Sequence, residues 1–333
     1  MDAEPLHALA SRFRGRRLLV TGGAGAIGAN LIRALLTAGG RVDATVRPGG
    51  QAWRLAGLGE ALTRHDVDVG NADALEQVFA RVRPEFVFHL AVPRGHDAAA
   101  RDEMLRVNVL GAQALLGCVR RHAVERLVVA GSSLEYAPSD TALKETAPIA
   151  PLTWHGATKA AAAVLYRQAA AEGGAPVSVL RLFHVYGPWE SAHRLAPTAI
   201  RAALSGDTMP MTAGGIRRDW VHVHDVCEAL LLAADKAAPG DVFNIGSGVE
   251  TSNEALVACV ESVLGRSVRR SAGELPPRAT DAEHRFADRS LAQARLGWVP
   301  RYSLADGLRQ TAAWHARHPS AWSDPDDQRP EAV

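Results

Sequence analysis

The segment LLVTGGAGAIGANLIRALL contains a glycine pattern that could bind a pyrophosphate. Gly22, Gly25 and Gly28 have G-x-x-G-x-x-G spacing between a short apolar run and an amphipathic helical pattern. Glycines let the backbone approach a phosphate closely, and free N–H groups at the positive end of a helix stabilise its charge. The βαβ continuation within about 30 residues is the context that such a site needs, which disfavours the alternative of a turn without ligand. We therefore predict a dinucleotide-binding turn made by Gly22, Gly25, Ala26, Ile27 and Gly28.

The end of the second apolar run indicates which dinucleotide is preferred. An acid there binds the ribose 2′-hydroxyl of NAD, whereas an arginine accommodates the 2′-phosphate of NADP. In RVDATVRPGG no acid follows the run, Arg47 does, and Asp43 lies within it. We predict that Arg47 binds the 2′-phosphate, so that NADP(H) is preferred over NAD(H); the alternative is that Arg47 only solvates a surface turn. Asp66, which follows the third run, is expected near the adenine, or else in an ordinary turn.

The elements that position these residues follow from the alternation of short apolar runs with helical-period segments. This alternation predicts an α/β, Rossmann-type doubly wound parallel sheet with a smaller C-terminal substrate-binding lobe. Strands are expected at Arg17–Thr21, Val42–Arg47, Thr63–Asp66, Phe86–Leu90, Leu127–Ala130 and Val177–Leu182. Later elements are expected at Trp220–Val223, Val242–Ile245, Asn253–Leu264 and Leu304–His315. We place the Rossmann domain at residues 1–182, the lobe at 183–318 and a flexible tail at 319–333.

Eight further segments occur in the order found in one enzyme family. They are FVFHLAV (86–92), RVNVLGAQALL (106–116), VVAGSSLEYAP (128–138), PLTWHGATKAAA (151–162), RLFHVYGP (181–188), RRDWVHVHDV (217–226), FNIGSG (243–248) and ADRSLAQARLGWVP (287–300). From residue 17 to about 316 the chain resembles the extended short-chain dehydrogenases/reductases, in the branch of NAD(P)-dependent nucleotide-sugar epimerases, dehydratases and 4-ketoreductases. The resemblance implies an oxidoreductase whose cofactor lies near Leu90 and Ala91, and whose substrate is a nucleoside-diphosphate sugar.

The resemblance also implies a catalytic Ser or Thr, a Tyr and a Lys. Ser132 stands four residues before Tyr136, where the family has its catalytic Ser or Thr, and Ser133 beside it is expected near the substrate. Lys159 matches the lysine of Y-x-x-x-K, which holds the nicotinamide ribose, but His155 stands in the position of the tyrosine. Residues at i and i+4 share a helix face, so His155 and Lys159 can both face the nicotinamide if a helix begins there.

Two interpretations of His155 remain open. Either it transfers the proton, or a water or Ser132 does so in a degenerate site. The unperturbed pKa of imidazole is roughly 6.5, against roughly 10 for a phenol, and a neighbouring ammonium lowers it further. His155 is therefore a ready proton acceptor and a poorer donor at neutral pH. This conflicts with the reduction that a preference for NADPH favours.

Two arginines match the family positions that clamp the substrate diphosphate. Arg218 opens RDWVHV, and Arg278 lies ten residues before Asp288. Guanidinium groups suit a diphosphate because they bind oxygens in pairs. His184 occupies a position where epimerases of the family often have a substrate-contacting Asn. Asn108 resembles the asparagine that steadies the active-site helix.

The histidines of RRDWVHVHDV could be mistaken for a metal site. His222 and His224 share a face if the segment is an alternating strand, as metal ligands would need. No third ligand of suitable spacing follows, and Asp225 is expected to cap a helix that begins at Val226. We predict that the protein binds no metal.

Composition limits the partners of the chain. Its 37 basic and 36 acidic side chains are balanced, which disfavours nucleic acid. Three distant cysteines do not indicate disulfides, and no signal peptide or run of about 18 apolar residues occurs, so a cytoplasmic protein without a membrane span is expected. Small residues in helices near Arg101–Arg121 and Gly156–Glu172 permit close packing, and because the family pairs these helices we predict a homodimer.

The leading functional hypothesis is an NADPH-dependent 4-ketoreductase that transfers a hydride to C4 of a nucleoside-diphosphate (deoxy)hexose. One alternative is a 4-epimerase that retains NAD(P). A 4,6-dehydratase is disfavoured, because that branch has a Glu two residues before Tyr136, where this chain has Leu134, with Glu135 one place off. Another alternative is a dinucleotide-binding sensor or partner protein whose catalysis has lapsed.

Overall fold

A seven-stranded parallel sheet forms the centre of the computed structural model, which describes residues 4–93, 95, 97–212, 214–275 and 283–323. In the order β10-β6-β5-β4-β1-β2-β3, its strands are Val242–Ile245, Val177–Leu182, Arg126–Ser132, Phe86–His89, Arg17–Thr21, Arg41–Val46 and Leu62–Asp66. Each neighbouring pair is parallel, and the strand order reverses between β1 and β4. This reversal is typical of a doubly wound sheet and confirms the predicted fold class.

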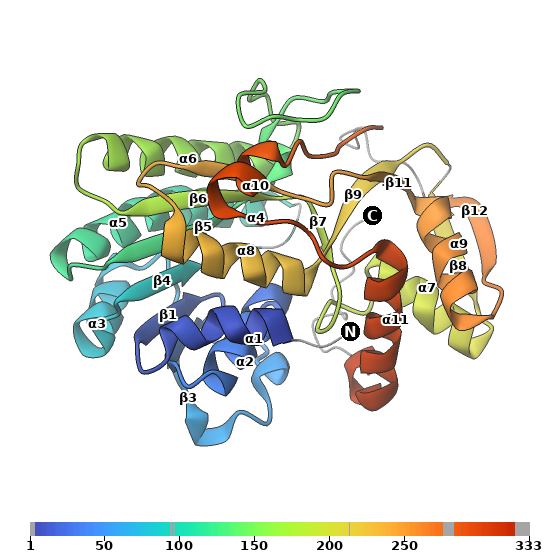
Figure 1. Cartoon of the computed structure of the whole chain (residues 1–333), viewed down its shortest axis with the longest axis horizontal. Coiled ribbons are helices and arrows are strands. Elements are labelled where there is room, and N and C mark those ends of the chain that lie inside the picture. Colours follow the sequence, from blue (N-terminus) through green and yellow to red (C-terminus); the bar gives the residue numbers. More distant parts are fainter. Residues whose placement is uncertain (1–3, 94, 96, 213, 276–282, 324–333) are drawn as a thin grey trace.

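Helices cover both faces of the sheet (Figure 1). One face packs against α1 (Glu4–Ala10), α2 (Ala26–Thr37), α8 (Val223–Lys236) and α10 (Ser290–Leu296); the other packs against α3 (Ala72–Val82), α5 (Gly111–Arg121) and α6 (Trp154–Ala171). Successive side chains of a strand point to opposite faces, so Leu18 enters the first core and Leu19 the second. This two-sided burial explains why the strands are short, continuous apolar runs.

The connection between β4 and β5 is not one regular helix. It consists of α4 (Ala98–Met104), a π-helical turn η4 (Leu105–Leu110) and α5. Asn108 lies in the π turn and is buried. Such turns occur frequently at functional sites, and sequence periodicity had predicted a single helix here.

The remaining elements form a smaller lobe with its own apolar core. Its helices are α7 (Leu195–Ser205), α9 (Asn253–Leu264) and α11 (Leu304–Arg317). Its strands form the sheets β11-β9-β7 (Glu250–Ser252, Arg217–His222, His184–Tyr186) and β12-β8 (Arg269–Leu275, Thr208–Thr212). The chain after residue 183 also supplies β10 and α8 to the main layer, where β10 pairs with β6. The two units are therefore intertwined along the sequence.

Two local predictions need correction. Asp225 does not cap α8, because this helix begins at Val223 and its N-cap is His222; the Asp225 carboxylate instead accepts bonds from the backbone N–H groups of Arg301 and Tyr302. Residues 319–323 of the expected tail form a 3-10 turn, in which Ala321 is buried and Trp322 stacks on His315. Residues 324–333 lie outside the described part of the chain.

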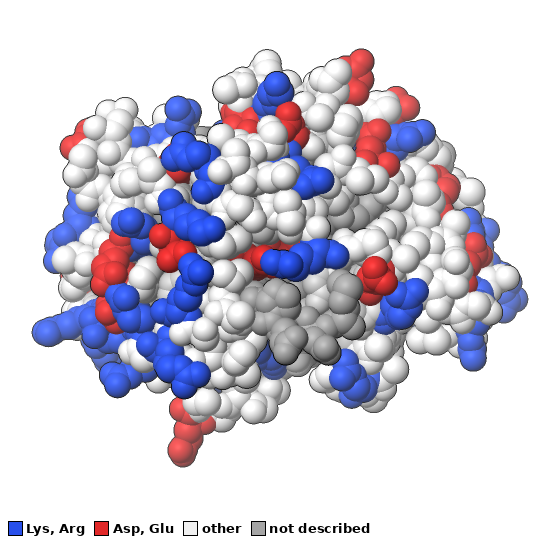
Figure 2. All heavy atoms as spheres, in the orientation of Figure 1, with Lys and Arg blue, Asp and Glu red and all other residues white. Residues whose placement is uncertain are grey.

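Charged side chains of both signs are interspersed on the face that displays α1, α8 and α10 (Figure 2). Some are paired, as Arg12 is with Asp235 and Arg295 with Asp241. In the described residues, no helix combines the length and the hydropathy that crossing a membrane requires. Cys118, Cys227 and Cys259 are unpaired thiols.

Candidate active site

The glycine turn after β1 lies where the strand order reverses, which is where doubly wound sheets bind ligands. Gly22 has φ +71°, and a Cβ there would lie 2.6 Å from the backbone N and Cα of Ala91. Leu90 donates its N–H to the Thr21 carbonyl over 3.1 Å. The structure therefore brings Gly22, Leu90 and Ala91 together, and a side chain at Gly22 would block their approach.

The start of α2 offers free backbone donors to an anion. Gly25 is the N-cap with no side-chain capping bond, and Ala26 and Ile27 are the first helical residues. A Cβ at Gly28 would lie 2.7 Å from the carbonyl oxygen of Gly22, so the turn folds tightly on the helix. This cradle suits the pyrophosphate of a dinucleotide, since the first N–H groups of a helix have no internal partner.

The loops after β2 and β3 contain the residues expected to select the cofactor. Arg47 directly follows β2, its side chain is 54% exposed, and its Nη1 lies 3.3 Å from Oε1 of Glu103. Asp43 binds Nε2 of His65 through Oδ1 at 2.7 Å, so the one acid of β2 is engaged within the sheet.

Asp66 ends β3 with an exposed side chain. Asp68 lies deeper in the same loop, where it accepts the N–H of Gly70 at 2.9 Å and pairs with Arg106 at 2.6 Å. Burial raises the pKa of Asp68, but the bonds from Arg106 and Gly70 outweigh it and hold this pKa below its ordinary value. The sequence interpretation missed Asp68. The available signal was a second aspartate two residues after Asp66.

Ser132 is the last residue of β5 and begins the 3-10 turn η5 (Ser133–Glu135). Its Oγ accepts the N–H of Leu134 at 3.2 Å, and its own N–H donates to Oε1 of Glu135 at 2.8 Å. The two bonds form a reciprocal cap that fixes the turn. Ser132 and Ser133 are both largely buried at the carboxyl end of the strand.

The first turn of α6 lies against the serine turn. Thr153 caps α6 by accepting the N–H of Gly156 at 3.0 Å, so His155 is the second helical residue and Lys159 follows one turn later. A Cβ at Gly156 would lie 2.1 Å from the carbonyl oxygen of Leu134, which shows how closely the two segments approach. His155 and Lys159 therefore share a helix face, as the spacing predicted, while their roles remain predictions.

Lys159 is 7% exposed and donates Nζ to the carbonyl oxygen of Ala130 at 2.8 Å. Burial lowers the pKa of Lys159 to about 8, and the charge of Glu135 acts in the opposite direction. Asn108 donates Nδ2 to Oγ1 of Thr158 at 2.9 Å, next to Lys159 on the same helix. The π turn is thus bonded to the active-site helix, the contact that the resemblance implied for Asn108.

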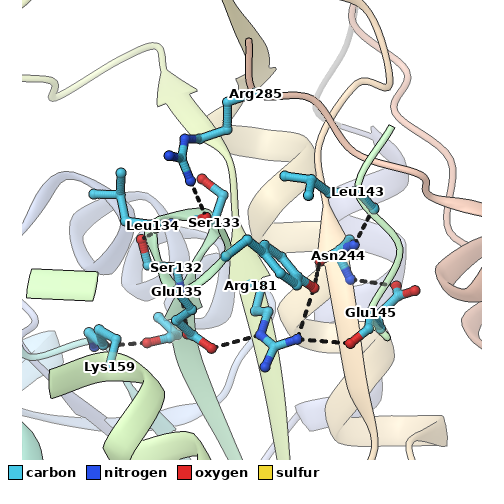
Figure 3. A network of polar contacts seen from close by, with 12 residues as sticks. Ser132, Ser133, Leu134, Glu135, Leu143, Glu145, Lys159, Arg181, Asn244 and Arg285 are labelled. Carbon is cyan, nitrogen blue, oxygen red and sulfur yellow. Dashed lines mark hydrogen bonds and ion pairs between the residues drawn. The ribbon is translucent and has the colours of Figure 1, made fainter. Parts of the chain in front are cut away.

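A buried polar network supports the serine turn from below (Figure 3). Glu135 has no exposed surface, and its Oε2 accepts from Nε of Arg181 at 2.7 Å. Arg181 also donates to the hydroxyl of Tyr136 at 2.9 Å, and Tyr136 donates to Oδ1 of Asn244 at 2.7 Å. From the other side, Arg285 donates Nη1 to the carbonyl oxygen of Ser133 at 2.5 Å. Sequence reasoning did not assign Arg181 or Arg285 to the site.

Basic groups gather around His184 on β7. Its ring centroid lies 4.2 Å from that of Trp220, and its Nε2 lies 3.1 Å from Nη2 of Arg194. Burial, with the positive charges of Arg194 and Arg218, lowers the pKa of His184 well below its ordinary value. Arg194 was missed by the sequence interpretation, and Arg278 lies outside the described residues.

The histidines near β9 do not lie as predicted for an alternating strand, because β9 ends at His222 and His224 belongs to α8. Their ring centroids are 5.0 Å apart, and Nδ1 of His224 lies 3.3 Å from the Tyr302 hydroxyl. Within the described ranges, no three side chains of His, Cys, Asp or Glu are grouped so that they could hold a metal ion.

The chain is similar to known proteins over most of its length. Residues 18–246 match the model of the NAD dependent epimerase/dehydratase family. A dTDP-glucose 4,6-dehydratase of Streptomyces griseus is 30% identical, with 92% of this chain and 95% of that protein covered. The structure of MoeE5 in complex with UDP-glucuronic acid and NAD is 33% identical, with a TM-score of 0.78 and coverage of 90% and 99%. The UDP-glucose 4-epimerase of Thermotoga maritima, with UDP-glucose, is 27% identical, with a TM-score of 0.82 and coverage of 91% and 99%.

Proposed function

Because the chain belongs to the NAD-dependent epimerase/dehydratase family, we propose that it transfers a hydride between a nicotinamide dinucleotide and C4 of a nucleoside-diphosphate hexose, in the leading form as an NADPH-dependent 4-ketoreductase. The family match confirms the predicted family and enzyme class, and the structural neighbours have the predicted fold. The substrate class, the direction of the reaction and the roles of the residues are our proposal.

One observation carries the proposal: the serine turn meets the first turn of α6, so that Ser132, His155 and Lys159 come from two segments in contact. A bound reduced nicotinamide would supply the hydride to C4. The hydroxyl of Ser132 binds the C4 oxygen, and His155 as imidazolium gives that oxygen its proton, so that the ketone becomes an alcohol. Lys159 holds the nicotinamide ribose.

Dehydration at C5 and C6 is not part of the proposed reaction, although relatives with that activity are similar in sequence. By resemblance, the dehydratase branch uses a Glu at the position of Leu134. The nearest carboxylate, Glu135, is completely buried and bonded to Ser132 and Arg181. A carboxylate engaged on both oxygens in the protein interior is unsuited to removing a substrate proton.

We infer NADP(H) as the preferred cofactor from the end of β2. Asp43 is bonded to His65, and no acid follows the strand, so the ribose 2′-hydroxyl has no carboxylate partner there. Arg47 has a largely exposed guanidinium beside Glu103 and could exchange this partner for a 2′-phosphate.

The diphosphate clamp that we propose combines Arg218 with Arg278 and adds Arg194. Arg194 contacts His184, and the charges of Arg194 and Arg218 both act on its ring. The charges of both guanidinium groups thus act on the position of His184, where we place the diphosphate.

A 4-epimerase is the second candidate. Its support is the similarity to the Thermotoga maritima epimerase, whose structure contains UDP-glucose. The pairing of Arg47 with Glu103 also supports it, because Glu103 competes with a 2′-phosphate for the guanidinium. Such an enzyme oxidises C4, turns the ketone and reduces its other face without net consumption of cofactor.

The experiment that tests the proposal is a screen of UDP-, TDP-, GDP- and CDP-linked hexoses and their 4-keto forms with NADPH. For a reductase we expect one NADPH oxidised for each 4-keto sugar reduced, and for an epimerase interconversion of C4 epimers at constant cofactor. Ser132→Ala is the control, because it should lower turnover and leave NADPH binding intact. Tight cofactor binding without any turnover would instead support the lapsed, sensor-like protein.

A further inference from the structure

We propose that Glu135 is a positioning residue for the reaction: its buried carboxylate fixes the backbone of Ser132 and acts as the counter-charge of Lys159. This inference rests on the proposed function for its effect on turnover, whereas its effect on Lys159 can be measured without any substrate. Neither the sequence motif nor the dehydratase comparison assigns this role.

Glu135 is in direct contact with the backbone of Ser132. Oε1 of Glu135 accepts the Ser132 N–H at 2.8 Å, and a Cβ at Gly131 would lie only 2.8 Å from the same oxygen. The carboxylate therefore lies directly against the backbone that precedes the Ser132 side chain. Because β5 ends here, this bond and the reciprocal bond to the Ser132 hydroxyl decide where that hydroxyl points.

The carboxylate of Glu135 is held in its position against Ser132 by further bonds. Its Oε2 is bonded to Arg181, and Arg181 is held in turn by the hydroxyl of Tyr136 and the carbonyl oxygen of Glu145 at 3.1 Å (Figure 3). Burying an ion pair generally brings little stability over an apolar pair of the same volume. A positioning role explains why charges are buried directly behind the serine turn.

The groups around Lys159 determine its electrostatic environment. Its ammonium is buried, and the small cavity beside it is lined by His89, Asn108 and Tyr166. His89 is buried with its pKa lowered to about 3, first by burial and then by the charge of Lys159, and Tyr166 is buried with a raised pKa, so both are neutral. Arg181, behind Glu135, is a cation. Lys159 bonds to the carbonyl oxygen of Ala130, and Glu135 bonds to the N–H of Ser132 two residues along β5, so the charge of Glu135 lies where it favours protonated Lys159.

A histidine in place of tyrosine makes this counter-charge more important. A phenol that gives up its proton becomes an anion next to the ammonium, which is favourable. An imidazole that is ready to give a proton is a cation next to the ammonium of Lys159, which is unfavourable. A buried carboxylate that acts on Lys159 offsets this repulsion, so Glu135 fits the unusual proton donor that we propose for His155.

The test compares the full-length protein with Glu135→Gln, Glu135→Asp and, as a matched control, Glu145→Gln. Glu145 belongs to the same network, where Oε1 accepts the Asn244 N–H at 2.8 Å, but it has no bond to Ser132. The first readout is the reactivity of Lys159 toward acetic anhydride as a function of pH, measured by mass spectrometry without substrate. We expect the curve of Lys159 reactivity against pH to shift to lower pH by about 1 unit in Glu135→Gln and to be unchanged in Glu145→Gln.

The second readout is turnover, which Glu135→Gln should lower roughly 10- to 100-fold at unchanged affinity for the cofactor. In the pH profile of kcat, the decrease at alkaline pH should move to lower pH in Glu135→Gln. A purely structural defect would not cause that movement. Glu135→Asp keeps the charge but shortens the side chain. We therefore expect this variant to have the same Lys159 reactivity curve as the parent, but a lower kcat.

Identical Lys159 curves for the parent and a folded Glu135→Gln protein would overturn the counter-charge. If Glu135→Gln does not fold, Glu135→Asp decides, because parental kcat in that variant would show that the contact with Ser132 is not needed. If no nucleotide sugar is turned over by any variant, the proposed function fails, while the Lys159 curves still test Glu135.

Discussion

The proposed proton transfer depends on the imidazole of His155. It lies in the first turn of α6, one turn before Lys159, whose pKa is lowered to about 8 by burial. Burial thus brings the change of charge of Lys159 closer to neutral pH than that of an exposed lysine.

We predict that His155→Ala lowers kcat by roughly 10²- to 10⁴-fold, the usual contribution of a positioned acid or base, with little change in cofactor affinity. Steady-state kinetics and NADPH fluorescence titration measure the two quantities. A reductase that needs imidazolium should lose kcat as pH rises through the histidine pKa, whereas an oxidation that needs neutral imidazole should gain.

His155→Tyr is the control, because it restores the family's acid beside Lys159 and should move the pH dependence upward. If His155→Ala is as active as the parent and the parent has a flat pH profile, the proton donor would be Ser132 or a water rather than His155.

The predicted preference for NADP(H) depends on Arg47. We predict that NADPH binds more tightly than NADH, and that Arg47→Asp narrows or inverts this difference because the 2′-phosphate then meets an anion. Glu103→Gln should act in the opposite direction, since it releases Arg47 from its present partner. Titration of both cofactors into the three proteins measures this, and equal affinities in the parent would contradict the assignment.

At the scale of single residues, the sequence predicts those whose role follows from backbone geometry. Gly22 and Gly28 occupy places where a Cβ would collide, and their spacing between a strand and a helix shows this in advance. Glu135 and Arg194 could not be found in this way, because their partners Arg181 and His184 are distant or depend on how loops fold. Glu135 was noted only as one position away from a family motif.

The elements of the site are fitted to one another most tightly where α6 begins. We predict that Gly156→Ala destabilises the protein by about 1–3 kcal/mol, because the new methyl group would overlap the carbonyl oxygen of Leu134. Turnover should fall as well, since the first turn of α6 would move away from Ser132.

Gly117→Ala in α5 is the matched control. A Cβ there would meet only the flexible end of Arg121 at 3.1 Å, so helix propensity should stabilise the protein by roughly 0.5–1 kcal/mol. Urea denaturation measures both variants. A Gly156→Ala protein as stable and active as the parent would contradict the close contact.

The proposed diphosphate clamp combines Arg218 on β9, Arg194 before α7 and Arg278, which lies outside the described residues. We predict that replacing Arg218 or Arg278 by Ala lowers nucleotide affinity by about 1.5–3 kcal/mol, the value of a charge-assisted bond, and that Arg194→Ala has a similar effect. NADPH affinity should not change. Calorimetric titration with UDP and TDP measures this, and unchanged binding in the Arg218 and Arg278 variants would refute the clamp.

Elements were predictable where local periodicity and burial agree. The strands β1, β6 and β10 have the predicted bounds, and the other predicted strands shift by a few residues at their ends. The π turn around Asn108 was not predictable, because its extra residue is accommodated by contacts with α6 that periodicity does not contain. The start of α8 at Val223 was missed because His222, which is a weaker cap than Asp225, accepts the capping bond.

On the scale of the whole molecule, the chain passes more than once between the seven-stranded sheet with its helices and the smaller lobe. The segment predicted as a second lobe returns to the main sheet through β10 and α8. A boundary at residues 182 and 183 separates β6 from β10, which are neighbours in one sheet. Division of the protein at this boundary would therefore expose the edge of β6, and the two parts are not expected to fold independently.

The last prediction concerns assembly, and it follows from apolar side chains that the monomer leaves in contact with water. Leu105 and Leu110 of η4 are 42% and 59% exposed, and Trp154, Val164 and Leu165 of α6 are 48%, 64% and 37% exposed. η4 and α6 contact each other, so these side chains lie on neighbouring elements beside the active site. A second copy of the chain can bury them by the same surface on both partners.

We predict a homodimer with twice the chain mass of 35.4 kDa at micromolar concentration, measured by light scattering. Val164→Glu should shift the protein to the monomer, because a carboxylate would then be buried in the interface. Val249→Glu is the matched control, since Val249 is 62% exposed on the other lobe and its replacement should leave the dimer intact. A parent mass near 35.4 kDa would contradict the homodimer, and equal dimerisation of both variants would place the interface elsewhere.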